Sequence, residues 1–232
     1  MPTLLVTGAN RGLGLEFTRQ YAEAGWQVHA CSRNPEDSTA LKALHIAHLD
    51  RITLHKLDVA DFKQIDALAE TLGDTPIDVL LNNAGVYPDH AGSRLSEADY
   101  EAWLMAFRIN SMSPLKIAQT FAPLVAKSTE KKIINITSKM GSIADNGSGG
   151  SYIYRSSKTA LNSVTKSLAI DLAPQGISVL ALHPGWVQTD MGGPNGLINA
   201  EQSVSGMRQV IAKLSVKQSG QFSAYDGQSI PW

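Results

Sequence analysis

The sequence predicts an α/β protein with one doubly wound, mostly parallel sheet of the Rossmann type, in a single domain that spans residues 1–232. Short runs rich in Val, Ile and Leu alternate with longer segments of helical periodicity along the whole chain. The first run leads directly into a glycine-rich turn, TGANRGLG, and then into a helical segment. Parallel neighbours need long crossover connections, so the helices should cover both faces of the sheet.

The first part of the chain contains four strand-like runs, TLLVT, QVHAC, ITLHK and IDVLL. Their β-branched and apolar residues favour strands that are buried in a sheet. Between them, apolar residues recur every three or four positions, which is typical of helices that pack on one side. We therefore expect strands at 3–7, 27–31, 52–56 and 77–81, and helices at 12–24, 36–47 and 61–72.

The second part continues the alternation with longer helices. The runs KIINIT and ISVLALH have the composition of buried strands. The Gly/Ser-rich stretch at 145–151 is too short for a domain boundary, and we expect a loop there that yields to a ligand. The expected helices are 96–119, 152–173 and 200–214, and the expected strands are 132–137, 177–183 and 220–224.

Composition excludes several classes of function. The chain is 43% hydrophobic and 18% charged, and its formal net charge of -1 provides no field that attracts nucleic acid or an anionic membrane. The basic stretch at 127–132 is interrupted by Glu130, and no apolar run approaches the ~18 residues of a membrane span. The amino-terminal residues enter a strand at once without a charged leader, so we expect a cytoplasmic protein. The single cysteine, Cys31, lies in an apolar run, where a buried thiol without a chemical role is expected, and no metal site is predicted.

The glycine-rich turn has the properties of an anion site. Gly8 would allow a sharp exit from the first strand, Gly12 the close approach of a pyrophosphate, and Gly14 tight packing of helix on sheet. Backbone N–H groups and the helix dipole would then face the anion. The spacing G-x3-G-x-G differs from the general dinucleotide fingerprint, and a glycine-rich turn without a ligand stays as the alternative.

Two tyrosines precede a lysine in the stretch SYIYRSSK. Tyr154 stands four residues before Lys158, so their side chains would share one face of a helix, whereas Tyr152 has Ser156 in the corresponding place. An ammonium group near a phenol favours the phenolate and lowers its pKa, which makes the phenol a usable proton donor or acceptor. Spacing thus favours Tyr154, although two surface residues of a helix could show the same pattern.

Five motifs in order make the interpretation specific: TGx3GxG at the first turn, NNAG at 82–85, NITS at 135–138, Tyr-x-x-x-Lys at 154–158 and HPGWVQT at 183–189. Together they resemble the short-chain dehydrogenase/reductase family over essentially the whole chain. The stretches DNGSGGSYIYRSSK, GWVQTDMGG and YDGQSIPW are similar to its carbonyl-reductase subgroup, which includes the sniffer and C-factor proteins.

The resemblance implies a catalytic tetrad. Tyr154 would be the acid/base, Lys158 would hold the nicotinamide ribose and lower the phenol pKa, and Ser138 would donate a hydrogen bond to the substrate oxygen. Asn110 would hold a water that links the lysine to solvent, with a surface or capping role as the alternative. Ser138 and Tyr154 lie further apart than is common in the family, which leaves Ser142 as a weaker candidate for the serine role. Ser138 has priority because it ends a strand.

The resemblance also implies the coenzyme contacts. The glycine turn would bind the pyrophosphate, the stretch LDVAD would line the adenine pocket, NNAG would lie beside the coenzyme, and HPGWVQT would contact the nicotinamide end. The residues so implied, with Tyr154 and Lys158 of the tetrad, are Gly8, Asn10, Arg11, Gly12, Leu13, Gly14, Asp58, Val59, Asn82, Ala84, Gly85, Pro184, Gly185, Val187 and Thr189.

The end of the second strand predicts the coenzyme NADP. An NAD site places an acidic side chain there, where it binds ribose hydroxyls and repels a 2′-phosphate. This chain has Ser32 in that position, followed by Arg33, and Arg11 could approach the phosphate from the other side. In the alternative interpretation Arg33 is an exposed loop residue and Arg11 only stacks on the adenine.

We therefore expect an NADPH-dependent reductase of small ketones, aldehydes or quinones, with an NADP-binding signalling or regulatory protein as the alternative. The segment 192–205 should form a lid over the substrate, and the apolar Leu197, Ile198 and Met207 suggest an uncharged substrate, although a helix packed on the sheet would look the same. The helices at 96–119 and 152–173 are the family's usual dimer surface, which predicts a homodimer or homotetramer.

Overall fold

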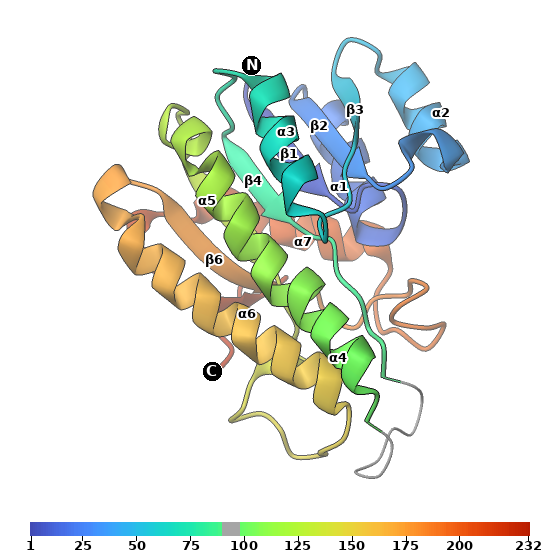
Figure 1. The fold of residues 1–232 in the computed structure, drawn as a ribbon, viewed down its shortest axis with the longest axis vertical. Coiled ribbons are helices and arrows are strands. Elements are labelled where there is room, and N and C mark those ends of the chain that lie inside the picture. The colour runs from blue at the N-terminus through green and yellow to red at the C-terminus, as the bar shows by residue number, and fades with distance from the viewer. Residues whose placement is uncertain (90–97) are drawn as a thin grey trace.

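Seven parallel strands form one sheet at the centre of the structure, in the order β3-β2-β1-β4-β5-β6-β7 (Figure 1). The structure is a computed structural model and describes residues 1–89 and 98–232. The strand order reverses between β1 and β4, which creates the crevice where open α/β sheets bind ligands. The strands are β1 Thr3–Thr7, β2 Gln27–Ser32, β3 Ile52–Lys56, β4 Val79–Asn82, β5 Lys132–Ile136, β6 Ser178–His183 and β7 Phe222–Ala224.

Helices cover both faces of the sheet, as the sequence predicts. Leu4 and Val6 of β1 belong to a core shared with α1 and α7, whereas Leu5, which points to the opposite face, joins a core shared with α3, α5 and α6. Figure 1 shows α3, α5 and α6 on the near side of the sheet and α7 behind it. The helices are α1 Gly12–Glu23, α2 Thr39–Ala47, α3 Phe62–Leu72, α4 Tyr100–Phe107, α5 Ser113–Ala126, α6 Tyr152–Asp171 and α7 Ala200–Lys213.

The helix expected at 96–119 is wrong as a continuous element, and its first two residues lie outside the described residues. Helix α4 ends at Phe107, a π-helical turn spans Arg108–Met112, and α5 continues to Ala126. Pro114 lies at the start of α5 and has no N–H group with which to continue the helical ladder. The π-helical turn contains Asn110, whose side chain bonds to the backbone of Val86. A tertiary contact therefore decides the local backbone.

The fourth strand also differs from the expected 77–81. It spans Val79–Asn82, and just before it the carboxylate of Asp78 accepts hydrogen bonds from the N–H groups of Thr3, at 2.9 Å, and of Thr129 and Glu130. Asp78 thus ties the start of the strand to a neighbouring loop, while its backbone bonds to Thr3 and Lys132 at the starts of the flanking strands. Cys31 is fully buried, as predicted, and burial raises the pKa of its thiol.

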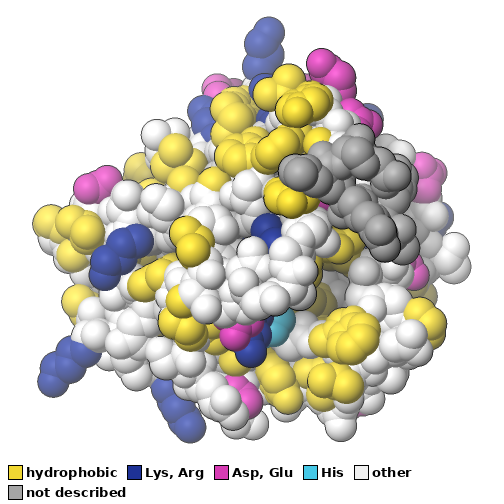
Figure 2. Space-filling model, turned by 90° about the horizontal axis from the view of Figure 1, so that it is seen from below, with side chains coloured by type: hydrophobic (Ala, Val, Ile, Leu, Met, Phe, Trp, Pro, Cys, Tyr) yellow, Lys and Arg dark blue, Asp and Glu magenta, His cyan; other side chains and the backbone are white. Residues whose placement is uncertain are grey.

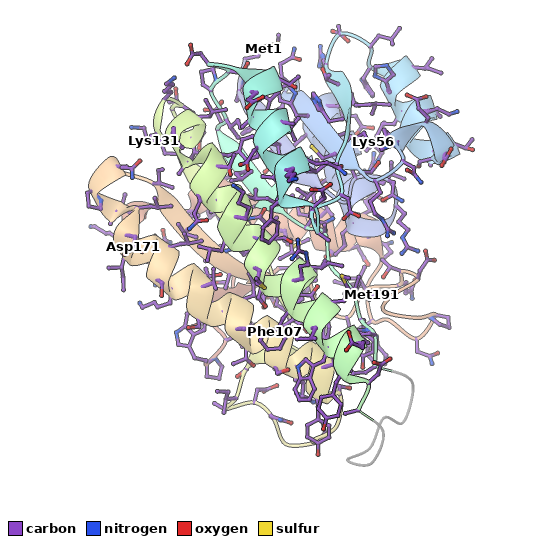
Figure 3. All side chains as sticks on the ribbon, in the orientation of Figure 1. Met1, Lys56, Phe107, Lys131, Asp171 and Met191 are labelled. Atoms are coloured by element: carbon purple, nitrogen blue, oxygen red, sulfur yellow. The ribbon has the colours of Figure 1, made fainter. Side chains whose placement is uncertain are left out.

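The carboxyl ends of the strands and the loops that follow them gather at one end of the molecule, the lower end in Figure 1. Figure 3 labels Met1 and Lys131 near the opposite end, and Phe107 and Met191 toward the loop end. Figure 2 looks onto the loop end and shows hydrophobic side chains around a hollowed surface. Among the helices of residues 1–89 and 98–232, none is both long and apolar enough to cross a membrane.

Candidate active site

The tyrosine and lysine of the YRSSK motif both lie on α6 and turn toward the sheet. The side chains of Tyr154 and Lys158 are buried, whereas Tyr152 is 40% exposed. The Lys158 Nζ atom lies 5.8 Å from the centre of the Tyr154 ring. Of the two tyrosines, only Tyr154 therefore shares an interior face with the lysine.

Ser138 approaches the same phenol from the sheet. It follows β5 and begins a short 3-10 turn at Lys139–Gly141, where its Oγ atom accepts a hydrogen bond from Met140. Burial raises the pKa of the Tyr154 phenol, and the Ser138 hydroxyl opposes that rise. The turn packs closely on α6, because a Cβ atom at Gly141 would lie 2.8 Å from the backbone of Lys158.

The other serine candidate has different partners. The Ser142 hydroxyl donates to the Trp232 carbonyl at 3.3 Å and accepts a hydrogen bond from the Asp145 N–H group at 3.1 Å. Ser142 therefore helps to hold the loop that follows Ser138, which leaves Ser138 as the hydroxyl beside the phenol.

Asn110 is fully buried, so a role at the surface is wrong. Its Oδ1 atom accepts a hydrogen bond from the Val86 N–H group, and its Nδ2 atom donates to the Val86 carbonyl and to Ser157, each at 2.9 Å. The π-helical turn supplies the local backbone that directs this side chain inward, and such turns often occur at functional sites. Asn110 thereby joins α6 to the loop that follows β4.

Burial dominates the titration of the two central groups. It raises the pKa of Tyr154 to about 12, an effect that the Ser138 hydroxyl opposes and Tyr87 reinforces. Burial also lowers the pKa of Lys158 to about 8. The Lys158 Nζ atom donates a hydrogen bond to the Ile136 carbonyl at 2.9 Å. At neutral pH the site therefore holds a protonated phenol and an ammonium group that loses its proton more readily than usual.

The glycine turn has the close packing that its sequence predicts. Gly8 adopts a φ of +70°, a left-handed backbone that favours glycine. A Cβ atom at Gly14 would lie 2.0 Å from the Gly8 carbonyl oxygen. The start of α1 can therefore pack against the turn only because residue 14 is a glycine. The Asn83 Nδ2 atom donates to the carbonyls of Thr7 and Gly8 at 2.8 and 3.3 Å. The turn is thus braced by the loop after β4, with backbone groups left facing the crevice.

The segment that follows β6 crosses over the glycine turn. A Cβ atom at Gly12 would lie 3.6 Å from the Thr189 side chain. The next residue, Asp190, forms an ion pair with Arg11 at 2.7 Å, and both side chains are largely exposed. The residues expected to contact the pyrophosphate and the nicotinamide are therefore brought together, but Arg11 binds a carboxylate here.

The end of β2 fits a ribose or a ribose phosphate. Ser32 is buried, and its Oγ atom has no hydrogen-bond partner among the described residues, which marks a polar group ready for a ligand. Arg33 follows on the surface, as one alternative predicted. Because Ser32 and the glycine turn end adjacent parallel strands, both can reach one dinucleotide.

The remaining coenzyme candidates fall into two groups. Some are near the crevice: a Cβ atom at Gly85 would lie 3.1 Å from the Asn110 Oδ1 atom and 3.5 Å from the Lys158 Nζ atom. Others bear structural contacts, such as Val59, whose carbonyl accepts a hydrogen bond from Ser113. Hydrogen bonds within the protein also engage the side chains of Asp58 and Asn82 and the backbone of Asn10, Ala84 and Pro184. The other three candidates make packing or pairing contacts: Leu13 with the core, Gly185 with Tyr225, and Val187 with Ile198.

The profile of the family described as short chain dehydrogenase matches residues 2–197. The chain belongs to the short-chain dehydrogenase family. The C-signal protein of Myxococcus xanthus is 42% identical over 166 residues, which is 72% of this chain and 99% of that protein. The structure of the carbonyl reductase Sniffer of D. melanogaster superposes with a TM-score of 0.92 and 36% identity over the whole of both chains. An NADPH-bound carbonyl reductase from chicken fatty liver gives a TM-score of 0.91 and 32% identity, over 100% of this chain and 99% of that one.

These comparisons confirm the family resemblance and the fold class that the sequence predicts. In a short-chain dehydrogenase of this kind, the described residues 1–89 and 98–232 show no cluster of three or more His, Cys, Asp or Glu side chains that could hold a metal.

The segment 192–205, which the sequence predicts to be a lid, divides into an irregular part and the start of α7. The backbone from Gly192 to Asn199 is irregular, and Leu197 is 79% exposed, so it is available at the loop end. Met207 is wrong as a lid residue: it is fully buried in the core between α7 and the sheet. Helical periodicity placed an apolar residue on a packed face but did not tell which partner it meets.

Three further residues of this dehydrogenase contact the glycine turn or the start of α6 and were missed by sequence reasoning. They are Asn83, which braces the glycine turn, and Tyr87 and Asp89, which contact the start of α6. Asn83 stands inside the NNAG motif and could have been found there. Tyr87 and Asp89 have no local signal, because their partners lie 64 or 65 residues later in the sequence.

Proposed function

We propose that the protein reduces ketones, aldehydes or quinones with NADPH. The observation that carries the proposal is the pair of a buried phenol, Tyr154, and a strand-end hydroxyl, Ser138, beside a glycine turn at the carboxyl edge of the sheet. When bound, NADPH supplies the hydride that reaches the carbonyl carbon. Tyr154 donates its phenolic proton to the carbonyl oxygen, so that the products are an alcohol and NADP⁺.

The neighbouring side chains have distinct roles in this reaction. Ser138 donates a hydrogen bond to the carbonyl oxygen and orients the carbonyl group. Lys158 holds the nicotinamide ribose through its ammonium group, and Asn110 keeps the π-helical turn and the loop after β4 in register with α6. The raised pKa of Tyr154 keeps the proton on the phenol until the substrate oxygen develops charge.

The proposal includes NADP rather than NAD. The end of β2 carries Ser32, with an unpartnered buried hydroxyl, and then Arg33, and no carboxylate stands at the position that would bind an NAD ribose. An arginine fork suits a 2′-phosphate. The similar reductase from chicken fatty liver was solved with NADPH bound, which supports this choice.

The test of turnover uses purified protein, NADPH and a panel of carbonyl compounds, followed by the loss of nicotinamide absorbance. Tyr154→Phe should lower kcat by about 100-fold or more, because the proton donor is lost, while NADPH binding changes little. Tyr152→Phe is the matched control, since Tyr152 lies on the same helix at the surface. Turnover that survives Tyr154→Phe would contradict the assignment.

The coenzyme choice has its own test. Wild type should prefer NADPH over NADH by about tenfold or more in kcat/KM, because charge-assisted contacts contribute about 1.5–3 kcal/mol each. The double variant Ser32→Asp with Arg33→Ala should reverse this preference, since it installs a ribose acceptor and removes a phosphate partner. Equal use of both coenzymes by wild type would show that the strand end has been misinterpreted.

A second candidate is an NADP-binding regulatory protein with little turnover, which the similarity to the C-signal protein favours. The presence of Tyr154, Lys158, Ser138 and Asn110 together favours the reductase, because a binding protein needs no proton donor. Tight NADPH binding without reduction of any carbonyl in the panel would favour the regulatory protein.

Location in the cytoplasm and assembly into a homodimer or homotetramer also belong to the proposal. The apolar side chains of Leu104 and Met105 on α4 and of Ile170 on α6 are exposed, as expected for helices that meet a second copy. Light scattering at about micromolar concentration tests the assembly, and a monomeric mass would reject it.

A further inference from the structure

Helix α6 carries Tyr154 but begins without a cap of its own. The first N–H groups of a helix have no partner inside the helix. Ser151, which precedes α6, makes no capping hydrogen bond with its side chain, and its backbone is left-handed with φ +46° and ψ +46°. A non-glycine residue in this region is held there by its surroundings. The first turn of α6 therefore depends on contacts from outside the helix.

The carboxylate of Asp89 supplies those contacts. Its Oδ2 atom accepts a hydrogen bond from the Tyr154 N–H group at 2.7 Å, and its Oδ1 atom accepts one from the Ile153 N–H group at 3.3 Å. Asp89 is buried, with 8% of its surface exposed. A carboxylate at a helix N-terminus is stabilising, and a short charge-assisted bond is among the stronger ones. The shorter of the two bonds ends on the backbone of the residue that donates the proton.

A second contact comes from Tyr87, two residues before Asp89. Its hydroxyl group lies 2.9 Å from the Ser151 Oγ atom, and its ring centre lies 4.5 Å from that of Tyr154, with the two planes inclined by 57°. Tyr87 thus limits the movement of the Tyr154 ring while it holds the residue that precedes the helix. The segment 87–89 after β4 therefore contacts the backbone and the ring of Tyr154 and also Ser151, the residue that precedes α6.

Four of the other helices in the described residues begin with a cap of their own. Helices α2, α3, α4 and α7 are capped by the side chain that directly precedes each of them, such as Asp99 before α4. In α6 the cap comes instead from the loop of another strand, and Ser138 comes from the loop of β5. The position of the phenol relative to the serine hydroxyl therefore depends on how the β4 and β5 loops lie beside each other.

We propose that Asp89, together with Tyr87, is a positioning residue for the acid/base tyrosine. The two side chains fix the start of α6 so that the Tyr154 phenol and the Ser138 hydroxyl converge on one carbonyl oxygen. The inference rests on the proposed function, because it holds that these contacts position Tyr154 for proton transfer to the substrate. Displacement of a reacting group by about 1 Å can cost about 100-fold in rate, so small shifts of α6 should be visible in kcat.

The experiment compares Asp89→Ala, Asp89→Asn and Tyr87→Phe with wild type and with Asp99→Ala. Asp99 is the matched control, because its carboxylate also caps a helix and accepts a hydrogen bond from the Ala102 N–H group at 3.0 Å. Unlike Asp89, Asp99 is exposed and caps α4, which does not carry Tyr154. Each protein is first titrated with NADPH, so that kcat is expressed per coenzyme-binding site. The solvent deuterium isotope effect on kcat is then measured, and hydrogen exchange of the first turn of α6 is followed by mass spectrometry.

Asp89→Ala should lower kcat per site by about 10–100-fold, increase the solvent isotope effect and speed exchange in the first turn of α6, while the NADPH Kd changes by less than about threefold. Asp89→Asn should recover part of the loss, because an amide oxygen still accepts a hydrogen bond. Tyr87→Phe should give a smaller loss of the same kind, and Asp99→Ala should leave kcat within about twofold.

The opposite results are equally clear. If Asp89→Ala keeps wild-type kcat per site, so that any fall in total activity follows the number of coenzyme-binding sites, or if kcat per site falls with an unchanged isotope effect, Asp89 is only a structural cap. If Asp89→Ala does not fold, the same criteria apply to Asp89→Asn and Tyr87→Phe. Failure of wild type itself to reduce any carbonyl would overturn the proposed function. That outcome differs from wild-type turnover that the substitutions of Asp89 leave unchanged, which would overturn only this inference.

Discussion

Replacing Lys158 by methionine should stabilise the coenzyme-free protein while it removes turnover. Burial lowers the pKa of Lys158 from 10.5 to about 8. One pKa unit corresponds to about 1.4 kcal/mol, so the charged side chain costs the folded protein about 3 kcal/mol relative to the unfolded chain at neutral pH. Loss of the hydrogen bond to the Ile136 carbonyl offsets about 1 to 2 kcal/mol of this. The variant should therefore be more stable by about 1 to 2 kcal/mol.

The sign of the pH dependence follows from the two pKa values. Below about pH 8 both the folded and the unfolded wild type carry the proton on Lys158, and the full cost of burying the charge is present. Between about 8 and 10.5 the unfolded chain still binds the proton and the folded protein does not, so wild-type stability rises with pH. Burial raises the pKa values of Cys31 and Tyr21, but these groups titrate in both proteins and cancel in the difference. The advantage of Lys158→Met should therefore shrink across this window.

The assay is urea unfolding of coenzyme-free wild type, Lys158→Met and Lys166→Met at several pH values between about 7 and 10. Lys166 lies on the same helix but is exposed, so its replacement should change stability by less than about 0.5 kcal/mol. A Lys158→Met protein that is less stable than wild type at neutral pH, or a difference that does not vary with pH, would refute the argument from burial.

Three further predictions address the coenzyme crevice. Gly14→Ala should weaken NADPH binding by about tenfold or more, because its Cβ atom would lie 2.0 Å from the Gly8 carbonyl oxygen and force the turn apart; Gly147→Ala, with no atom within 4 Å of the new Cβ, should have no effect in the same fluorescence titration. Asp190→Asn should tighten NADPH binding by up to about fivefold, since an exposed ion pair contributes about 0.2–1 kcal/mol and Arg11 becomes free for the phosphate; unchanged affinity would assign Arg11 no such role. The kcat/KM for NADPH should be level up to about pH 8 and fall above it as Lys158 loses its proton, while Tyr154, with a pKa of about 12, stays protonated; a fall that begins well below pH 7 in a pH profile would point to another group.

The sheet could be predicted from the sequence because its central strands β1, β4, β5 and β6 are buried on both faces. The run 3–7 is apolar or β-branched throughout, the run 52–56 begins with Ile, Thr and Leu, and the strands Thr3–Thr7 and Ile52–Lys56 have the expected bounds. The helix at 96–119 could not be predicted correctly. Its interruption depends on Asn110, whose partners Val86 and Ser157 are 24 and 47 residues away, and no local periodicity encodes them.

The candidate site shows the same division. The glycine turn and the Tyr154–Lys158 pair follow from spacing within one turn or one helix, so the sequence is sufficient to place them. The contacts of Tyr87 and Asp89 with α6 join loops of different strands and appear only when the sheet order is known. The single carboxylate of Asp89 could equally have been a surface residue of any loop.

Two of the four buried side-chain atoms that have no hydrogen-bond partner among the described residues lie where the coenzyme is expected. Ser32 ends β2 and Asn82 ends β4, on either side of β1 and its glycine turn, and the Ser32 Oγ and Asn82 Oδ1 atoms are both buried without a hydrogen-bond partner. Each such group costs about 1–3 kcal/mol, and the buried ammonium of Lys158 adds a cost of similar size. A fold selected for stability alone would replace these side chains with apolar ones. Their presence at the ends of the two strands that flank β1 is therefore best explained by a polar ligand that completes them. The stability that Lys158→Met recovers measures the cost of one such polar group.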